Sequence, residues 1–127
     1  MAKTVLLVED EPSLASALTQ KVAGAGHTAL TAKDGEEGLK LALDHHPDII
    51  LLDLLLPKRD GMSMLRMLRQ DEWGAQVPVI ILSNLSDSSH IFDSLHSGAL
   101  DYLVKADSSL DDVMRQIENR LNGPSVV

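Results

Sequence analysis

Short apolar runs alternate with longer amphipathic segments along the whole chain. The runs are rich in Val, Ile and Leu, and most of them lack a strict apolar–polar alternation, which is typical of parallel strands covered on both faces. The second run is less apolar, so we expect it at a sheet edge. The predicted strands are Thr4–Val8, Thr28–Ala32, Ile49–Asp53, Val79–Ser83 and Tyr102–Val104.

The segments between these runs carry helix start and stop signals. Pro12 occupies a first-turn position, and Asp34 and Glu37 have the spacing of a capping box. Asp111 and Asp112 suit the first turn of a last helix, because the helix dipole favours acidic groups there. The five predicted helices run from Pro12 to about Ala23, from Asp34 to a point before Pro47, from Gly61 to a point before Gly74, from Ser86 to Ser97, and from Ser108 or Ser109 to Asn122.

Five β-α units joined by short links predict an α/β fold, a doubly wound, five-stranded parallel sheet with five helices on its two faces. The chain has 127 residues and no cysteine. This length suffices for one domain with a full core and no disulfides. We expect the domain to span residues 1–122, with residues 123–127 as a C-terminal tail.

Charge and hydropathy exclude several functional classes. The net charge is −8, which argues against direct nucleic-acid binding, because binding to phosphates requires a basic surface. The longest apolar run, Ile49–Leu56, is interrupted by Asp53 and is too short to cross a bilayer. Residues 1–4 lead directly into a strand pattern, without the apolar region of a signal peptide. We therefore expect a cytoplasmic protein with no membrane insertion.

Polar residues follow the apolar strands where each strand ends. Glu9 and Asp10 follow the first strand, Asp53 and Ser83 end the third and fourth, and Lys105 follows the fifth. Ligands of open α/β sheets bind at the carboxyl ends of the strands. These side chains are therefore the candidate functional residues.

Asp53 lies inside an apolar stretch, where burial of a lone carboxylate is costly. A lone Asp could instead cap a helix or form a turn. With Glu9 and Asp10 nearby, however, three carboxylates repel one another and require a cation. Oxygen ligands favour Mg²⁺, with Mn²⁺ as a substitute. Together with the Lys105 ammonium and the Ser83 hydroxyl, the arrangement indicates a phosphoryl-transfer site with Asp53 as nucleophile.

Over essentially its whole length, the sequence resembles the receiver domains of the two-component response-regulator family, in particular stand-alone chemotaxis-type receivers. The resemblance implies a flavodoxin-like sheet with strand order 2-1-3-4-5. It is carried by four segments, Val5–Pro12, Asp53–Gly61, Val79–Ser83 and Gly98–Lys105.

By this resemblance, Asp53 accepts a phosphoryl group from a phosphohistidine on a sensor histidine kinase or a histidine phosphotransfer protein. Asp10 ligates Mg²⁺ directly, Glu9 does so mostly through water, and the backbone carbonyl of Leu55 is a further ligand. No dedicated substrate enzyme is implied, at most self-phosphorylation and autodephosphorylation on Asp53.

The remaining implied roles concern the switch. Lys105 pairs with a phosphoryl oxygen, Ser83 moves to bind another, and the Tyr102 ring turns inward as Ser83 moves. The output is a downstream protein target that binds the face formed by the fourth helix, the fifth strand and the fifth helix. The sequence leaves open whether a homodimer forms through this face.

One departure keeps an alternative open. Ala106 follows Lys105, where receivers usually have a proline, so a phosphorylation-independent pseudo-receiver that only binds partners is the second hypothesis. An aspartyl phosphatase of the haloacid-dehalogenase type is disfavoured, because Leu55 occupies the position of its general acid. A flavodoxin-like redox role is disfavoured by the acidic loop after the first strand, which would repel a cofactor phosphate.

Overall fold

The computed structural model describes residues 3–53, 61–83, 101–104 and 109–122. The predicted fourth helix at 86–97, the Lys105–Ala106 bond and the carbonyl of Leu55 lie outside these residues.

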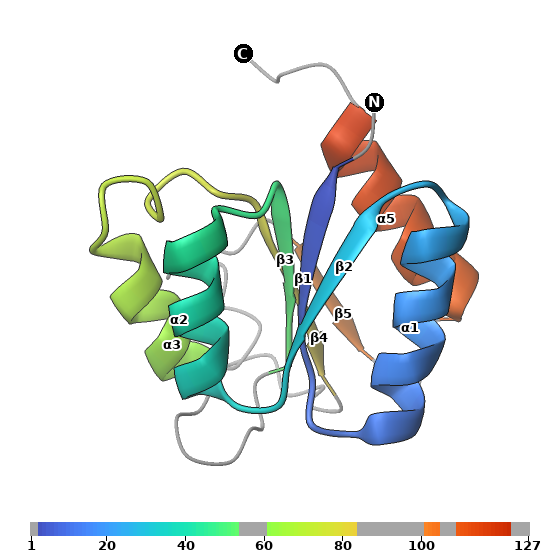
Figure 1. Cartoon of the computed structure of the whole chain (residues 1–127), viewed down its shortest axis with the longest axis horizontal. Helices are drawn as coiled ribbons and strands as arrows, with labels where there is room; N and C mark the ends of the chain where they lie inside the picture. Colours follow the sequence, from blue (N-terminus) through green and yellow to red (C-terminus); the bar gives the residue numbers. More distant parts are fainter. Residues whose placement is uncertain (1–2, 54–60, 84–100, 105–108, 123–127) are drawn as a thin grey trace.

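A five-stranded parallel sheet forms the middle layer of the domain (Figure 1). The strand order is β2-β1-β3-β4-β5, and the less apolar β2 is at an edge, as the sequence predicts. β3 ends at Leu52, one residue before the predicted end, and β5 begins at Asp101, one residue earlier than predicted. The strands are β1 (Thr4–Val8), β2 (Thr28–Ala32), β3 (Ile49–Leu52), β4 (Val79–Ser83) and β5 (Asp101–Val104).

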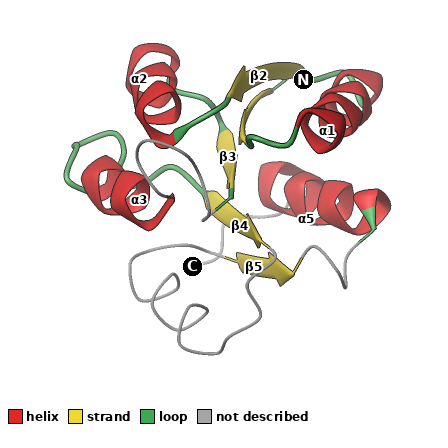
Figure 2. Ribbon diagram, turned by 90° about the horizontal axis from the view of Figure 1, so that it is seen from below, coloured by secondary structure: helices red, strands yellow, loops and turns green. Residues whose placement is uncertain are grey.

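Helices cover both faces of this sheet. α1 (Pro12–Gly24) and α5 (Leu110–Asn122) lie on one face, and α2 (Gly35–His45) and α3 (Gly61–Arg69) lie on the other (Figure 2). The described residues therefore form the predicted α/β arrangement with helices on both faces of the sheet, and they include four of the five predicted helices. None of the described helices is long and apolar enough to cross a membrane.

Successive strand residues supply two separate apolar cores, as expected when both faces of a sheet are covered. In β1, Leu6 and Val8 pack toward α2 and α3, whereas Val5 and Leu7 pack toward α1 and α5. All four side chains are at most 1% exposed. The two cores hold the strands in register, so the positions of the residues that follow the strands are also fixed.

The start of α2 is capped almost as predicted. The Asp34 carboxylate accepts the Glu37 backbone N–H at 2.8 Å. The Glu37 carboxylate accepts the N–H of Lys33 at 2.8 Å, rather than that of Asp34 as in a regular capping box. His46 ends the helix with a positive φ of 48°, and its ring stacks on Trp73 with 4.2 Å between ring centroids.

α3 ends before Gly74, as the sequence predicts. Its last residue is Arg69, and a series of turns replaces the helix before Gly74. The Arg69 guanidinium donates to the carbonyls of Gly74 and Val77, both at 2.7 Å, and the Gly74 N–H donates to Asp71 at 2.8 Å. These bonds stabilise the turn instead of further helix. Partial burial lowers the pKa of Arg69, although a guanidinium stays protonated in proteins.

α5 begins with a reciprocal cap that fits the predicted start near Ser109. The Asp112 N–H donates to the Ser109 hydroxyl, and the Ser109 N–H donates to the Asp112 carboxylate, both at 3.1 Å. The bond from the Ser109 backbone lowers the pKa of Asp112. Lys21 of α1 donates to Asp111 at 2.7 Å and lowers the pKa of that carboxyl. This ion pair joins the start of α5 to α1.

Candidate metal centre

The acidic residues lie directly after two adjacent strands. Val8 of β1 is paired in register with Leu52 of β3, so Glu9 and Asp53 continue the chain from neighbouring positions. The Asp53 N–H donates to the Val8 carbonyl at 3.0 Å, which extends the strand pairing by one bond. The sheet itself therefore places the two carboxylates at its carboxyl edge.

Glu9, Asp10 and Asp53 form one cluster, as the sequence predicts. Each offers a carboxylate oxygen, and these oxygens all lie within 4.8 Å of one another. Glu9 and Asp53 are each only 5% exposed, whereas Asp10 is exposed to solvent. The site therefore combines two buried carboxylates with one carboxylate that solvent can reach.

The backbone of the β1–α1 loop orients Glu9. The Glu11 N–H donates to the Glu9 carboxylate at 3.1 Å. This contact was not predicted, because a backbone donor leaves no signature in the residue types. Its consequence is that one oxygen of Glu9 is held by the loop while the side chain remains in the cluster.

The donor set fits a hard divalent cation. All three groups are carboxylates, and like charges this close favour a bound cation. Mg²⁺ binds through a small number of carboxylates and keeps several waters, and the exposed side of the cluster at Asp10 leaves room for water. The residues present thus fit Mg²⁺, in agreement with the ligand type predicted from the sequence.

The other predicted site residues are described only in part. Ser83 is the last residue of β4 and pairs in register with Val104, the residue before Lys105. Tyr102 lies in β5 opposite Ile81. Ser83 and the end of β5 therefore share the carboxyl edge with the acidic cluster, while Lys105 and Leu55 lie outside the described residues.

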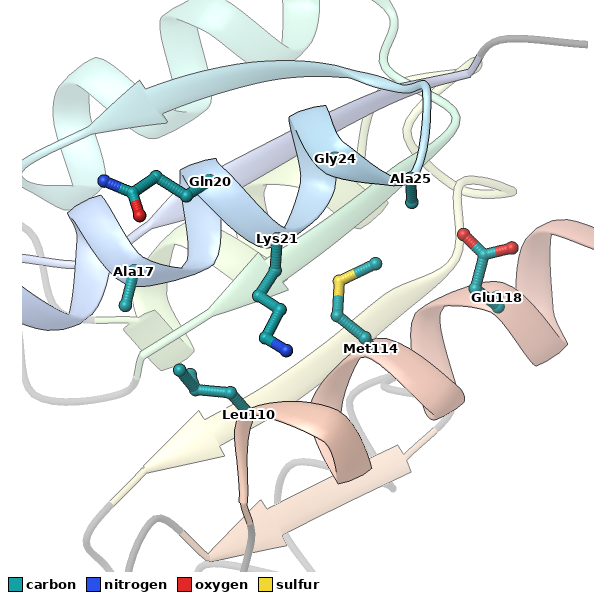
Figure 3. A pocket seen from close by; sticks show the side chains of 8 residues that line it. All are labelled: Ala17, Gln20, Lys21, Gly24, Ala25, Leu110, Met114 and Glu118. Atoms are coloured by element: carbon teal, nitrogen blue, oxygen red, sulfur yellow. The ribbon is translucent and has the colours of Figure 1, made fainter.

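A separate cleft between α1 and α5 was not predicted. It has a volume of about 540 Å³ (Figure 3). None of the acidic cluster residues lines it. The cleft arises from the packing of two helices far apart in the sequence, which no local pattern reveals. Its lining residues are Ala17, Gln20, Lys21, Gly24, Ala25, Leu110, Met114 and Glu118.

The doubly wound sheet with a carboxylate cluster at its carboxyl edge defines an open α/β protein with a candidate cation site at that edge. The response regulator receiver domain family matches residues 5–118. The chain belongs to this family. It is a receiver domain of two-component response regulators, a module whose signalling is controlled by phosphorylation.

Curated relatives agree with this assignment. The transcriptional regulatory protein AfsQ1 of Streptomyces coelicolor is 39% identical over 102 residues, which cover 80% of this chain and 44% of that protein. The DNA-binding regulator RpaA of Synechocystis is 38% identical over 101 residues, covering 80% of this chain and 42% of RpaA. This chain therefore spans less than half the length of these two relatives.

Solved structures share the fold. A Francisella response regulator receiver domain is 32% identical, with a TM-score of 0.86 over 94% of this chain and 96% of that one. The receiver domain of the sensor histidine kinase PA1611 of Pseudomonas aeruginosa is 28% identical, with a TM-score of 0.87 over 97% and 100% of the two chains. That receiver has a magnesium ion coordinated in its active-site cleft. Nothing in these comparisons supports the pseudo-receiver alternative.

Proposed function

We propose that this chain accepts a phosphoryl group on Asp53, from a sensor histidine kinase or a histidine phosphotransfer protein, with Mg²⁺ held by Glu9, Asp10, Asp53 and the backbone carbonyl of Leu55. One observation carries the proposal. The buried Asp53 carboxylate lies within 4.8 Å of the Glu9 and Asp10 carboxylates at the carboxyl edge of the sheet. In the related PA1611 receiver, magnesium is coordinated in the active-site cleft.

The transfer exchanges one bond to phosphorus for another. An Asp53 carboxylate oxygen forms a bond to phosphorus as the bond between phosphorus and the imidazole nitrogen of the donor breaks, and the imidazole takes a proton from solvent. When bound, Mg²⁺ neutralises negative charge on the transferring group. The pairing of β1 with β3 holds Asp53 beside the other carboxylates, so the nucleophile needs little reorganisation.

Three further residues complete the proposed switch. Lys105 supplies a point charge to one phosphoryl oxygen, and the Ser83 hydroxyl donates to another. The Tyr102 ring turns inward as Ser83 moves. The register of β4 with β5 supports this assignment, because it brings Ser83 and the end of β5 to the same sheet edge as Asp53.

The output follows from the same fold. We assign the fourth helix to Ser86–Ser97, the domain to residues 1–122 and the tail to 123–127. The fourth helix, β5 and α5 then form the face that binds a downstream protein or a second copy of the chain. The charge of −8 disfavours direct contact of this domain with DNA, although RpaA as a whole binds DNA. Cytoplasmic location fits a phosphohistidine donor of this kind.

A thermal-shift experiment tests the proposal. Millimolar MgCl₂ is expected to raise the melting temperature, because a ligand that binds only the folded state stabilises it, by about 2.7 kcal/mol at one hundred times its Kd. Beryllofluoride, a phosphoryl mimic used to activate the related RstA receiver, is expected to add a further increase only when Mg²⁺ is present.

Matched variants separate metal binding from general charge effects. Asp10→Asn should weaken the Mg²⁺ response at least about tenfold in concentration, because it removes the exposed ligand. Asp44→Asn removes the same charge from an exposed position on α2 and should leave the response unchanged. Equal responses of Asp10→Asn and the wild type would contradict the assigned metal centre.

A further inference from the structure

His27 is a buried side chain outside the acidic cluster. Each of its two ring nitrogens is hydrogen-bonded to a different segment of the chain. Its side chain is 6% exposed. Gly26, with a φ of +89°, reverses the chain after α1, and the His27 N–H then donates to the Val22 carbonyl at 3.1 Å. The turn between α1 and β2 therefore inserts the imidazole between the beginning of β1 and α5.

The two contacts of the ring define its protonation. The backbone N–H of Lys3 donates to Nδ1 at 3.1 Å, so Nδ1 carries a lone pair and no hydrogen. Nε2 lies 2.7 Å from the Glu118 carboxylate, which only accepts, so Nε2 carries the hydrogen. The ring is thus neutral and fixed in a single tautomer. Glu118 also lines the cleft in Figure 3, on α5.

We propose that His27 is a proton-operated latch, which holds the start of β1 only while its ring is neutral and holds α5 in both protonation states. A proton from solvent that binds Nδ1 turns this nitrogen into a donor facing another donor, the Lys3 N–H. The bond to Lys3 is then lost. The bond from Nε2 to Glu118 remains and becomes an ion pair, because the ring is now a cation.

Several charged groups on the elements next to His27 have partners of their own. Lys21 pairs with Asp111 and Arg115 pairs with Asp112, whereas Asp48 accepts the Thr4 N–H at 2.7 Å. Glu118 contacts the ring directly. On the elements next to His27, α5 carries Asp111, Asp112, Arg115, Glu118 and Arg120, α1 carries Lys21, and Lys3 and Asp48 directly precede β1 and β3.

The latch lies at the end of β1 opposite to the acidic cluster. Lys3 precedes β1, whereas Glu9 and Asp10 follow it. Histidine is the side chain that ordinarily changes charge between about pH 5 and 8. Mild acid should therefore loosen the amino-terminal end of the sheet, at the end of β1 away from the proposed phosphorylation site.

Nuclear magnetic resonance of the full chain tests the latch. At about pH 8 the ¹⁵N shifts of the His27 ring should report the Nε2–H tautomer. On acidification to about pH 5, the Lys3 amide shift should change with the same midpoint as the ring, and its protection from hydrogen exchange should fall by up to about tenfold.

Two variants test the contacts of the two ring nitrogens separately. In His27→Asn, the amide oxygen takes the place of Nδ1, so the Lys3 amide should stay protected at both pH values. In His27→Gln, the amide nitrogen takes the place of Nε2, so the Lys3 amide should be unprotected at both. A ring in the Nδ1–H tautomer at high pH, or a Lys3 amide in the wild type that does not follow the ring, would overturn the latch. The wild-type titration decides even if a variant fails to fold.

Discussion

Replacement of Asp53 with asparagine is expected to reduce phosphoryl incorporation to background. The amide keeps the size and shape of the side chain but removes the anionic oxygen that forms the bond to phosphorus. It also removes one charge from a cluster in which three carboxylates lie within 4.8 Å of one another. Transfer of labelled phosphate from acetyl phosphate, measured on the denatured protein, gives the readout.

The expected loss is specific to this carboxylate. Asp44→Asn, on the exposed side of α2, should incorporate phosphate like the wild type. The Asp53→Asn variant should also melt at or above the wild-type temperature, since the substitution relieves repulsion between like charges. Wild-type incorporation in a folded Asp53→Asn protein would show that another residue is the acceptor.

Gly74→Ala is expected to lower the free energy of unfolding by about 2–4 kcal/mol, through overpacking and disturbed hydrogen bonds. A Cβ at this position would clash with the Leu68 carbonyl oxygen and would lie 2.9 Å from the Leu68 side chain. The backbone must move to accept it. The Arg69 bonds to the carbonyls of Gly74 and Val77 would move as well.

Urea denaturation followed by far-ultraviolet circular dichroism measures this effect. Gly24→Ala is the matched control, because Gly24 lies in the last turn of α1 with nothing within 4 Å of an added Cβ. The control should be neutral or more stable by about 0.5–1 kcal/mol, as alanine has the higher helix propensity. Equal stability of Gly74→Ala and the wild type would contradict the described turn after α3.

The strands could be predicted closely from the sequence because the sheet is buried on both faces. The bounds of β1, β2 and β4 were predicted to the residue, β1 and β4 from continuous apolar runs and β2 from a less apolar one. β3 was predicted one residue too long, at Asp53, whose N–H still bonds to the Val8 carbonyl beyond the end of the strand. The exact residue at which a strand ends depends on single backbone hydrogen bonds of this kind, which residue types alone do not reveal.

Helix ends depend more on contacts made by individual side chains. The sequence placed the end of α3 only at some point before Gly74, because the hydrogen bonds from Arg69 that stabilise the following turn have no simple sequence signal. The start of α5 near Ser109 was predicted well, because the capping serine and Asp112 are only three residues apart. Capping signals between residues a few positions apart can be recognised in the sequence. Contacts that depend on how the chain folds can be seen only in the structure.

The same distinction applies to the functional residues. The cluster of Glu9, Asp10 and Asp53 was confirmed, because parallel strands bring their carboxyl ends to one edge. The contact between His27 and Glu118 was missed, because it joins residues 91 positions apart through the packing of α5. What is confirmed is that these three carboxylates lie together; the roles predicted for Glu9, Asp10, Asp53, Lys105, Leu55, Ser83 and Tyr102 stay predictions.

The most direct test of the central claim is the intact mass of the protein after incubation with acetyl phosphate, with and without Mg²⁺. The account predicts a gain of one phosphoryl group per chain with Mg²⁺ and no gain when the metal is chelated. No gain in Mg²⁺, from a protein that binds beryllofluoride neither with nor without the metal, would contradict it and would favour a phosphorylation-independent module.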